Sequence, residues 1–213
     1  MKQIWDGTLS PAAYRGALSA LKTDFPTHYL IHEIPQILSQ IHRPKILIRH
    51  NIAGSLARAW DMARLEYELG YRASYMIQGD SPRMDLTHTG SIGILHKIRE
   101  LGHEIGLFMV LPETPHSLEE LERRVDEAGA RLQNLLDFPV FSVAFSSQVP
   151  GIPEDSQFVG SKINATAPLM MRWTLEDSQP LWVIEPPRAA GDDPARALLQ
   201  VIVRPDIWSF EQP

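Results

Sequence analysis

The 213-residue chain contains no cysteine. This absence excludes disulfides, thiolate metal sites, iron–sulfur clusters and a cysteine nucleophile, so any metal site has to be built from His, Asp or Glu. Blocks of like charge are also missing. There are 20 Lys and Arg residues against 26 Asp and Glu, and the formal net charge is −6. This balance disfavours a nucleic-acid partner.

Long apolar runs are absent too. No window approaches 18 uninterrupted apolar residues, and residues 1–7 lack the apolar stretch of a signal peptide. We therefore expect a cytoplasmic protein that does not enter a membrane. The composition, with 44% hydrophobic and 22% charged residues, is ordinary for a globular chain. We expect one domain over residues 1–213.

Strand and helix patterns alternate over the first two thirds of the chain. Branched apolar runs predict strands at 45–50, 73–77, 105–108 and 140–145. Apolar residues at helical spacing predict helices at 11–23, 56–67, 91–101 and 117–135. Successive strands lie roughly 27 to 37 residues apart, about the length of one βαβ repeat, which indicates parallel strands. The last third is less regular, with strands expected at 180–185 and 198–203.

In an α/β sheet or barrel, functional groups follow the C-terminal ends of the strands. The segments selected by this rule are 50–53, 78–80, 108–111, 144–148 and 204–208.

Two of these regions resemble a known family. Residues 49–53 read Arg-His-Asn-Ile-Ala and precede a helix ending in Leu-Gly, and residues 101–108 read Leu-Gly-His-Glu-Ile-Gly-Leu-Phe. Together with weaker matches further along the chain, these blocks resemble the polysaccharide deacetylase (NodB-homology) superfamily. The resemblance implies an α/β fold with parallel strands, an incomplete (β/α) barrel of the polysaccharide deacetylase type, and a context in carbohydrate metabolism.

The resemblance also implies a hydrolytic site whose chemical residues are missing here. In the family, one aspartate is the general base for a metal-bound water, a second aspartate and histidines hold the divalent metal, and another histidine protonates the leaving amine. The matching positions are Asn51, Ala53, Phe108, Ala144 and Arg204. An amide takes up no proton at neutral pH, alanine has no donor atom, and arginine keeps its proton. We therefore predict no catalytic residue of this type, no bound metal and no cofactor.

Other side chains near the expected strand ends are candidates for lining a pocket. These candidates are His50, Asn51, Asp80, Arg83, Asp177, Arg204, Asp206 and Trp208. Asp80 and Arg83 have the chemistry to bind hydroxyls or an anionic group, and the face of Trp208 can stack on a sugar ring. A partly buried Arg204 needs a carboxylate, a phosphate or an aromatic ring as its partner, and we expect Asp80 or Asp206 to be the nearest candidate.

Three interpretations of function remain open from the sequence. The leading one is a polysaccharide deacetylase-like pseudoenzyme without metal-dependent hydrolase activity, with a strand-end pocket for a carbohydrate, another small molecule or a protein partner. The alternative is a carbohydrate-active enzyme, either a deacetylase-type hydrolase of C–N bonds or one with altered chemistry, that uses a non-standard residue set. The third is a structural subunit that forms a homo-oligomer or stabilises an active relative.

Overall fold

A mostly parallel sheet forms the centre of the computed structural model, which describes residues 2–37, 44–147, 149, 152–153, 156–171, 173–184 and 198–209. Its strands are β2 (Thr27–Tyr29), β3 (Lys45–Ile52), β4 (Ser74–Ile77), β5 (Glu104–Met109), β6 (Ser142–Phe145), β7 (Phe158–Val159), β8 (Lys162–Asn164), β9 (Thr174–Glu176) and β11 (Leu198–Val203). The strand order is β7-β8-β6-β5-β4-β3-β11-β9, and β2 pairs with the start of β3. Among the described strands of this sheet, β7 and β8 pair antiparallel and every other pairing is parallel.

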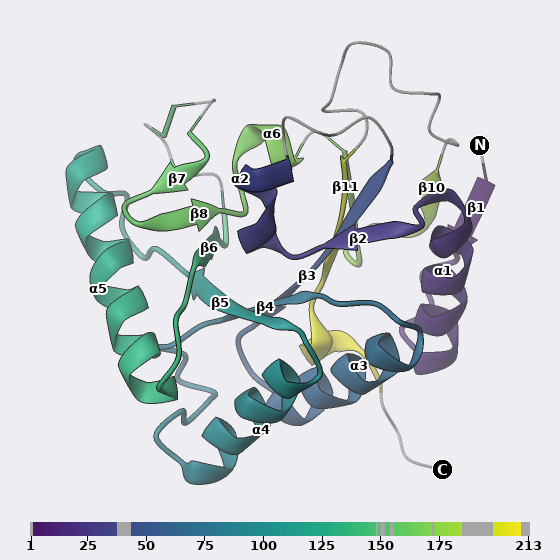
Figure 1. The fold of residues 1–213 in the computed structure, drawn as a ribbon, viewed down its shortest axis with the longest axis horizontal. Coiled ribbons are helices and arrows are strands. Elements are labelled where there is room, and N and C mark those ends of the chain that lie inside the picture. Colours follow the sequence, from purple (N-terminus) through teal and green to yellow (C-terminus); the bar gives the residue numbers. More distant parts are fainter. Residues whose placement is uncertain are drawn as a thin grey trace.

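The long helices lie in an arc along one side of this sheet (Figure 1). They are α1 (Pro11–Asp24), α3 (Leu56–Glu68), α4 (Thr89–Glu100) and α5 (Leu118–Leu136). The short elements η1 (Ile31–Glu33), α2 (Ile34–Ile37) and α6 (Pro168–Met171) lie on the other side, and η4 (Pro205–Ile207) follows β11. Beside α1, β1 (Lys2–Trp5) and β10 (Trp182–Ile184) form a separate antiparallel pair.

Local sequence signals explain where the helices begin and end. The hydroxyls of Ser10, Ser55 and Ser117 each accept a backbone N–H in the first turn of α1, α3 and α5. Gly70 and Gly102 have φ values of +72° and +87° just beyond α3 and α4, a conformation that glycine adopts without strain. The predicted helices and parallel strands are confirmed within a few residues, although α4 starts before Ser91 because the ring of His88 caps it.

The two faces of β3 are buried against different surroundings. On the outer face, Ile46, Ile48 and Ile52 pack into the larger apolar cluster with the long helices. On the inner face, Leu47 belongs to a second apolar cluster with residues from β4, β5, β6 and β8. Burial on both faces explains why β3 has a nearly continuous apolar sequence.

The sheet curves around its inner face. The carbonyl of Ala165, just after β8, accepts hydrogen bonds from Arg49 on β3 at 2.9 Å and from Gln200 on β11 at 3.2 Å. These strands are far apart in the sheet order, so only a curved sheet can bring them together. The strands at the two edges of the described sheet, β7 and β9, are not hydrogen-bonded to each other, so the described strands do not close into a barrel. The incomplete barrel and the extent of a single domain over 1–213 stay predictions.

A buried carboxylate connects the outer face of the sheet to the helices. Glu66 on α3 is inaccessible to solvent and accepts hydrogen bonds from the hydroxyls of Tyr14 and Tyr75 at 2.5 and 2.7 Å. Nε2 of His50 lies 2.6 Å from the same carboxylate. Burial by itself raises the pKa of Glu66, but His50 and the hydrogen bond from Tyr14 hold that pKa below its usual value.

The histidine next to this cluster is neutral. Nδ1 of His103 accepts the backbone N–H of Ala73 at 3.0 Å, so Nε2 carries the proton and donates it to the carbonyl of Ala63. Burial accordingly lowers the pKa of His103. Its 3.9 Å approach to Glu66 is therefore a contact between a neutral ring and a carboxylate.

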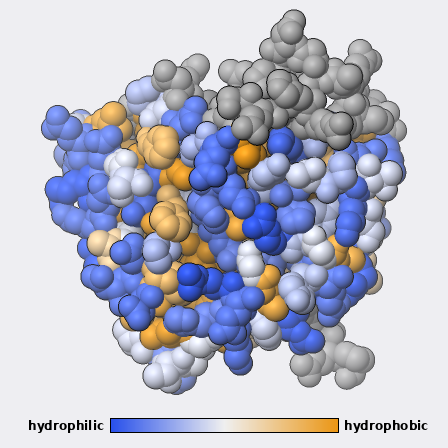
Figure 2. Space-filling model, in the orientation of Figure 1, coloured by the Kyte–Doolittle hydropathy of each residue, from blue (hydrophilic) through white to orange (hydrophobic). Residues whose placement is uncertain are grey.

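The exposed surface mixes polar residues with single apolar ones. Figure 2 shows a face on which hydrophilic residues predominate and apolar residues are scattered in small groups. The large exposed apolar side chains come from many elements, including Tyr67 on α3, Phe141 before β6 and Phe158 on β7. Each helix in the described ranges is too short or too polar to cross a bilayer.

Replacing Glu66 tests how much this buried cluster stabilises the fold. We expect Glu66→Gln to lower the free energy of unfolding by about 3 kcal/mol, because buried donors then face an amide that is itself partly a donor. The folded pKa lies below the unfolded value of about 4.3. The difference between wild type and variant should therefore be fully present above that pH and shrink as the pH falls through the folded pKa.

Urea unfolding monitored by circular dichroism measures this difference. Glu68→Gln, on the exposed side of the same helix, is the matched control and should unfold at nearly the wild-type urea concentration. Equal midpoints for the two variants at pH 7 would contradict a stabilising role for Glu66.

Candidate functional site

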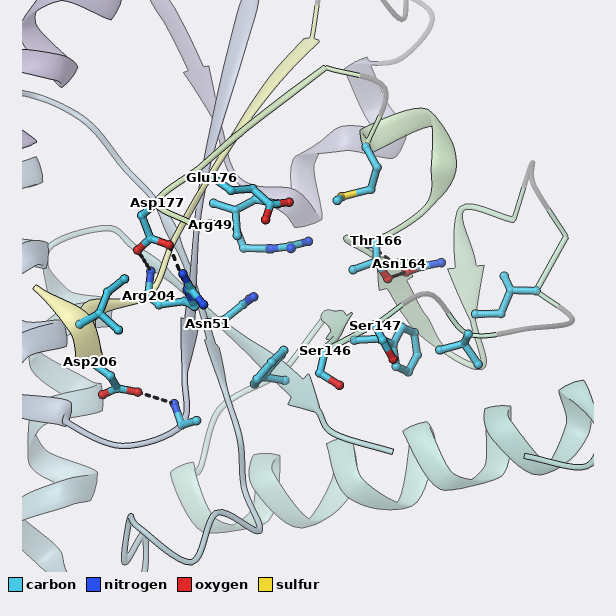
Figure 3. Close-up of a pocket in the computed structure, with 18 of the residues that line it drawn as sticks. Arg49, Asn51, Ser146, Ser147, Asn164, Thr166, Glu176, Asp177, Arg204 and Asp206 are labelled. Carbon is cyan, nitrogen blue, oxygen red and sulfur yellow. Dashed lines mark hydrogen bonds and ion pairs between the residues drawn. The ribbon is translucent and has the colours of Figure 1, made fainter. Parts of the chain in front are cut away.

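A cavity of about 810 Å³ lies at the C-terminal ends of the parallel strands. It collects residues from β3, β5, β6, β8, β9 and β11 and from the segments that follow them (Figure 3). Its polar lining comprises Arg49, Asn51, Arg83, Ser146, Ser147, Asn164, Thr166, Glu176, Asp177, Arg204 and Asp206. Its apolar lining comprises Ala53, Phe108, Phe145, Val149, Ile152, Met171, Ile202 and Ile207. The location agrees with the strand-end rule for α/β proteins.

Arg49 is the buried cation of this cavity. It lies on the inner face of β3, two residues before Asn51, and only 3% of its surface is exposed. Its Nη1 donates to the carbonyl of Ala165, and Figure 3 shows its guanidinium extending toward Thr166 and Asn164. Burial lowers the pKa of Arg49 to about 10 against an opposing effect of the charge on Glu176, so the side chain is still charged at neutral pH.

Asn51 lies beside Arg204 on the cavity wall (Figure 3). Its Oδ1 atom is buried and has no hydrogen-bond partner among the described residues. A buried acceptor without a donor is uncommon in a folded protein. This atom therefore marks a place where a donor from outside the chain would be accommodated.

Asp177 organises the rim of the cavity. Its carboxylate is 1% exposed and accepts the backbone N–H of Arg204 at 2.6 Å and Nε of Arg204 at 3.0 Å. The indole N–H of Trp208 donates to the same carboxylate at 2.9 Å. One buried carboxylate thus joins the end of β9 to the segment after β11.

The expected partner of Arg204 was wrong. Neither Asp80 nor Asp206 pairs with it, because β9 and β11 are parallel neighbours and their ends place Asp177 directly beside Arg204. Asp80 follows β4, and in the sheet β4 and β11 lie on opposite sides of β3.

Asp206 holds the loop between β3 and α3. Its carboxylate accepts the backbone N–H groups of Ser55 at 2.5 Å and Ala53 at 3.4 Å, and Arg58 donates to its backbone carbonyl. This approach favours glycine at position 54, since a Cβ there would lie 2.9 Å from Oδ1 of Asp206 and the carboxylate would have to shift. Asp206 lines the cavity, and each of its carboxylate oxygens accepts one backbone N–H group.

Three of the candidates from the sequence lie away from the main cavity. The ring of His50 is on the outer face of β3, bound to Glu66. Trp208 is fully buried behind the rim and stacks on Trp5, with centroids 5.6 Å apart and planes 22° apart. Asp80 is exposed and lines a separate cavity of about 180 Å³ between β5 and α5. The structure brings Asn51, Arg83, Asp177, Arg204 and Asp206 together around the main cavity.

Several lining residues were missed in the sequence. Arg49 could have been found, because a strand alternates its faces and Arg49 precedes Asn51 by two positions. Ser146 and Ser147 lie within a selected strand-end segment, whose last residue, Gln148, is outside the described residues. Asn164 and Thr166 follow a three-residue strand in the irregular last third, where no periodic pattern identifies a strand end.

The described lining does not fit the divalent metal of the deacetylase family. Asn51, Ala53 and Phe108 line the cavity, and Ala144 lies opposite Phe108 in the β5–β6 pairing. Within the described residues, no group of three His, Asp, Glu or Cys side chains is arranged to hold a metal ion. The carboxylates of Asp177 and Asp206 point into the rim contacts described above rather than toward a shared metal position.

Comparison with known proteins gives a likeness in fold. No family model matches the chain, and no curated protein sequence matches it. Among solved structures, it is similar to the Streptococcus pyogenes deacetylase PplD in complex with acetate, with a TM-score of 0.50 and 12% sequence identity. The match covers 67% of this chain and 65% of that one, so the chain spans just under two thirds of PplD.

A second similar structure is a family 4 acetyl xylan esterase from Clostridium thermocellum in complex with a cobalt ion. It has a TM-score of 0.34 and 14% identity, and the match covers 46% of this chain and 47% of the esterase. The likeness to PplD shows that the chain has a fold that a deacetylase also adopts, in agreement with the resemblance in sequence.

The rim contacts predict unequal effects for the two partners of the ion pair. Asp177→Asn should lower the free energy of unfolding by about 2 to 3 kcal/mol, because Trp208 and the backbone of Arg204 lose a buried charged acceptor. Arg204→Gln should change it by less than about 1 kcal/mol, since 45% of that side chain is exposed and the backbone hydrogen bond remains. Thermal or urea unfolding measures both, and a larger loss for Arg204→Gln would contradict the rim geometry.

Proposed function

We propose that this chain is a deacetylase-fold protein that binds a small, hydroxyl-rich ligand such as a sugar in the strand-end cavity and does not catalyse metal-dependent hydrolysis. The observation that carries the proposal is the cavity lining. Polar side chains from several strand ends line it, while the positions matched to the family's base and first metal ligands are Asn51, Ala53 and Phe108.

The cavity has the properties of a small-molecule site. Its volume of about 810 Å³ lies within the range of ligand pockets, which is roughly 300 to 1,000 Å³. Ser146, Asn164 and Thr166 supply donors and acceptors, and Phe108 and Phe145 supply apolar surface. Sugar rings, with hydroxyls at their edges and C–H groups on their faces, need this combination.

The same lining argues against hydrolysis by the mechanism of the family. Activating water requires a Lewis acid and a group that accepts the proton. Asn51 cannot accept a proton at neutral pH, and Ala53 and Phe108 offer no metal ligand. The oxygens of Asp177 and Asp206 are already bound within the rim.

Other parts of the sequence interpretation remain predictions. They are the cytoplasmic location and the association with a second copy or an active relative.

The first test measures metal content and hydrolysis together. Purified, untagged protein dialysed against buffer with added zinc should retain far less than one equivalent of metal by elemental analysis. It should release no acetate from chitooligosaccharides, because neither a base nor a Lewis acid is available for the water. One zinc, cobalt or nickel per chain, or acetate release that a chelator abolishes, would contradict the proposal and favour an active enzyme.

The second test asks whether one substitution restores chemistry. Asn51→Asp should produce no acetate, because a base without a bound metal leaves the water weakly acidic. Asn134→Asp, on the exposed surface of α5, changes the net charge equally and serves as the control. Acetate release by Asn51→Asp but not by the control would show that a metal site is already complete in the wild-type chain.

A further inference from the structure

We infer that the cavity binds an acidic sugar, and that Arg49 binds its anionic group. This group is a carboxylate or a phosphate. This inference rests on the proposed ligand-binding function and specifies the chemistry of the ligand.

The argument begins with the unsatisfied charge of Arg49. A guanidinium has five N–H donors. In the described structure, Nη1 of Arg49 donates to the carbonyl of Ala165, and Nε is buried without a partner. No carboxylate of the described residues forms an ion pair with the guanidinium. A buried cation is costly unless an anion or several acceptors compensate it. An anion in the adjoining cavity would supply that compensation.

The other cations of the cavity are already compensated. Arg204 is paired with Asp177, and about half of its side chain is exposed. Arg83 is exposed to solvent. Glu176 is the carboxylate whose charge acts on Arg49, but it lies beyond ion-pair distance and accepts a hydrogen bond from Ser178. Arg49 is thus the buried cation of the described lining that still lacks an anion.

A purely structural role does not explain an arginine at this position. Its contact with the carbonyl of Ala165 needs one N–H group, and the neutral amide of Gln200 already donates to the same carbonyl. A neutral side chain would hold that loop without the cost of burying a charge. The charge itself therefore points to a ligand.

Neighbouring groups indicate what accompanies the anionic group. Oδ1 of Asn51 has no donor among the described residues, and the carboxylate of Glu176 lies near Arg49 on the cavity wall (Figure 3). Both accept hydrogen bonds from hydroxyls. A ligand with an anion for Arg49 and hydroxyls for these acceptors satisfies the lining, which is the chemistry of a sugar acid or a sugar phosphate.

Calorimetric titration of the wild-type protein tests this inference. The probes are glucuronate, its neutral analogue glucuronamide, and glucose 6-phosphate. We expect at least one anion to bind about tenfold or more tightly than glucuronamide, because charge-assisted hydrogen bonds are the stronger ones. Preference for glucuronate identifies a carboxylate as the source of the anion, and preference for glucose 6-phosphate identifies a phosphate.

Variants then assign the effect to Arg49. Arg49→Gln should abolish the preference for the anion, so that glucuronate, glucose 6-phosphate and glucuronamide bind this variant with affinities within about twofold of one another. Arg131→Gln, which removes the same charge beside the smaller cavity, should retain the preference. Circular dichroism verifies the fold of each variant. If Arg49→Gln does not fold, Arg49→Lys replaces it and should weaken anion binding by losing the planar fork.

The outcomes separate this inference from the proposed function. Equal affinities for glucuronate, glucose 6-phosphate and glucuronamide would overturn the inference and leave sugar binding intact. An anion preference that persists in Arg49→Gln, or that is undiminished in the Arg49→Lys replacement, would overturn the assignment to Arg49. Failure of all three probes to bind at millimolar concentration would overturn the inference together with the proposed function.

Discussion

The carboxylate of Glu66 determines which side chains of β3 reach the cavity. His50 bonds to it from the outer face of the strand, and side chains alternate along a strand. Arg49 and Asn51 must therefore point inward. A shift of one residue in the pairing of β3 would turn both away from the cavity and leave Glu66 without His50. The tyrosines of α1 and β4 converge on the same carboxylate, so the helix layer and the sheet are positioned together.

The charged side chains around the cavity divide into two kinds. Asp177 and Asp206 bind backbone N–H groups and neighbouring side chains, and they fix the segments after β9, β3 and β11. These contacts direct both carboxylates into the rim of the cavity. Glu176 and the buried Arg49 have fewer contacts with the chain. Polar groups that support the cavity are therefore distinct from polar groups that remain for a ligand.

Much of the fold could be predicted from local patterns. Ser10, Ser55 and Ser117 cap helices, and Gly70 and Gly102 end them, because these effects depend on a few neighbouring residues. The parallel order of the central strands follows from the regular spacing of strands and helices. The placement of Trp208 could not be predicted, because a tryptophan near a strand end suits a pocket and a core equally well. Its contacts with Trp5 and Asp177 join segments far apart in the chain.

The sequence by itself determined the alternating elements, the strand-end positions, and the side chains at the family's chemical positions, since these depend on local spacing and on residue identity. Only the tertiary structure decided that Arg204 pairs with Asp177, that His50 faces Glu66, and that Arg49 is buried beside the cavity. The first and third of these arrangements arise from strand order and from the curvature of the sheet, and the second from the packing of α3 on β3. Strand order and curvature bring together residues more than a hundred positions apart, as in the bond between Arg49 and Ala165, and no local pattern records such contacts.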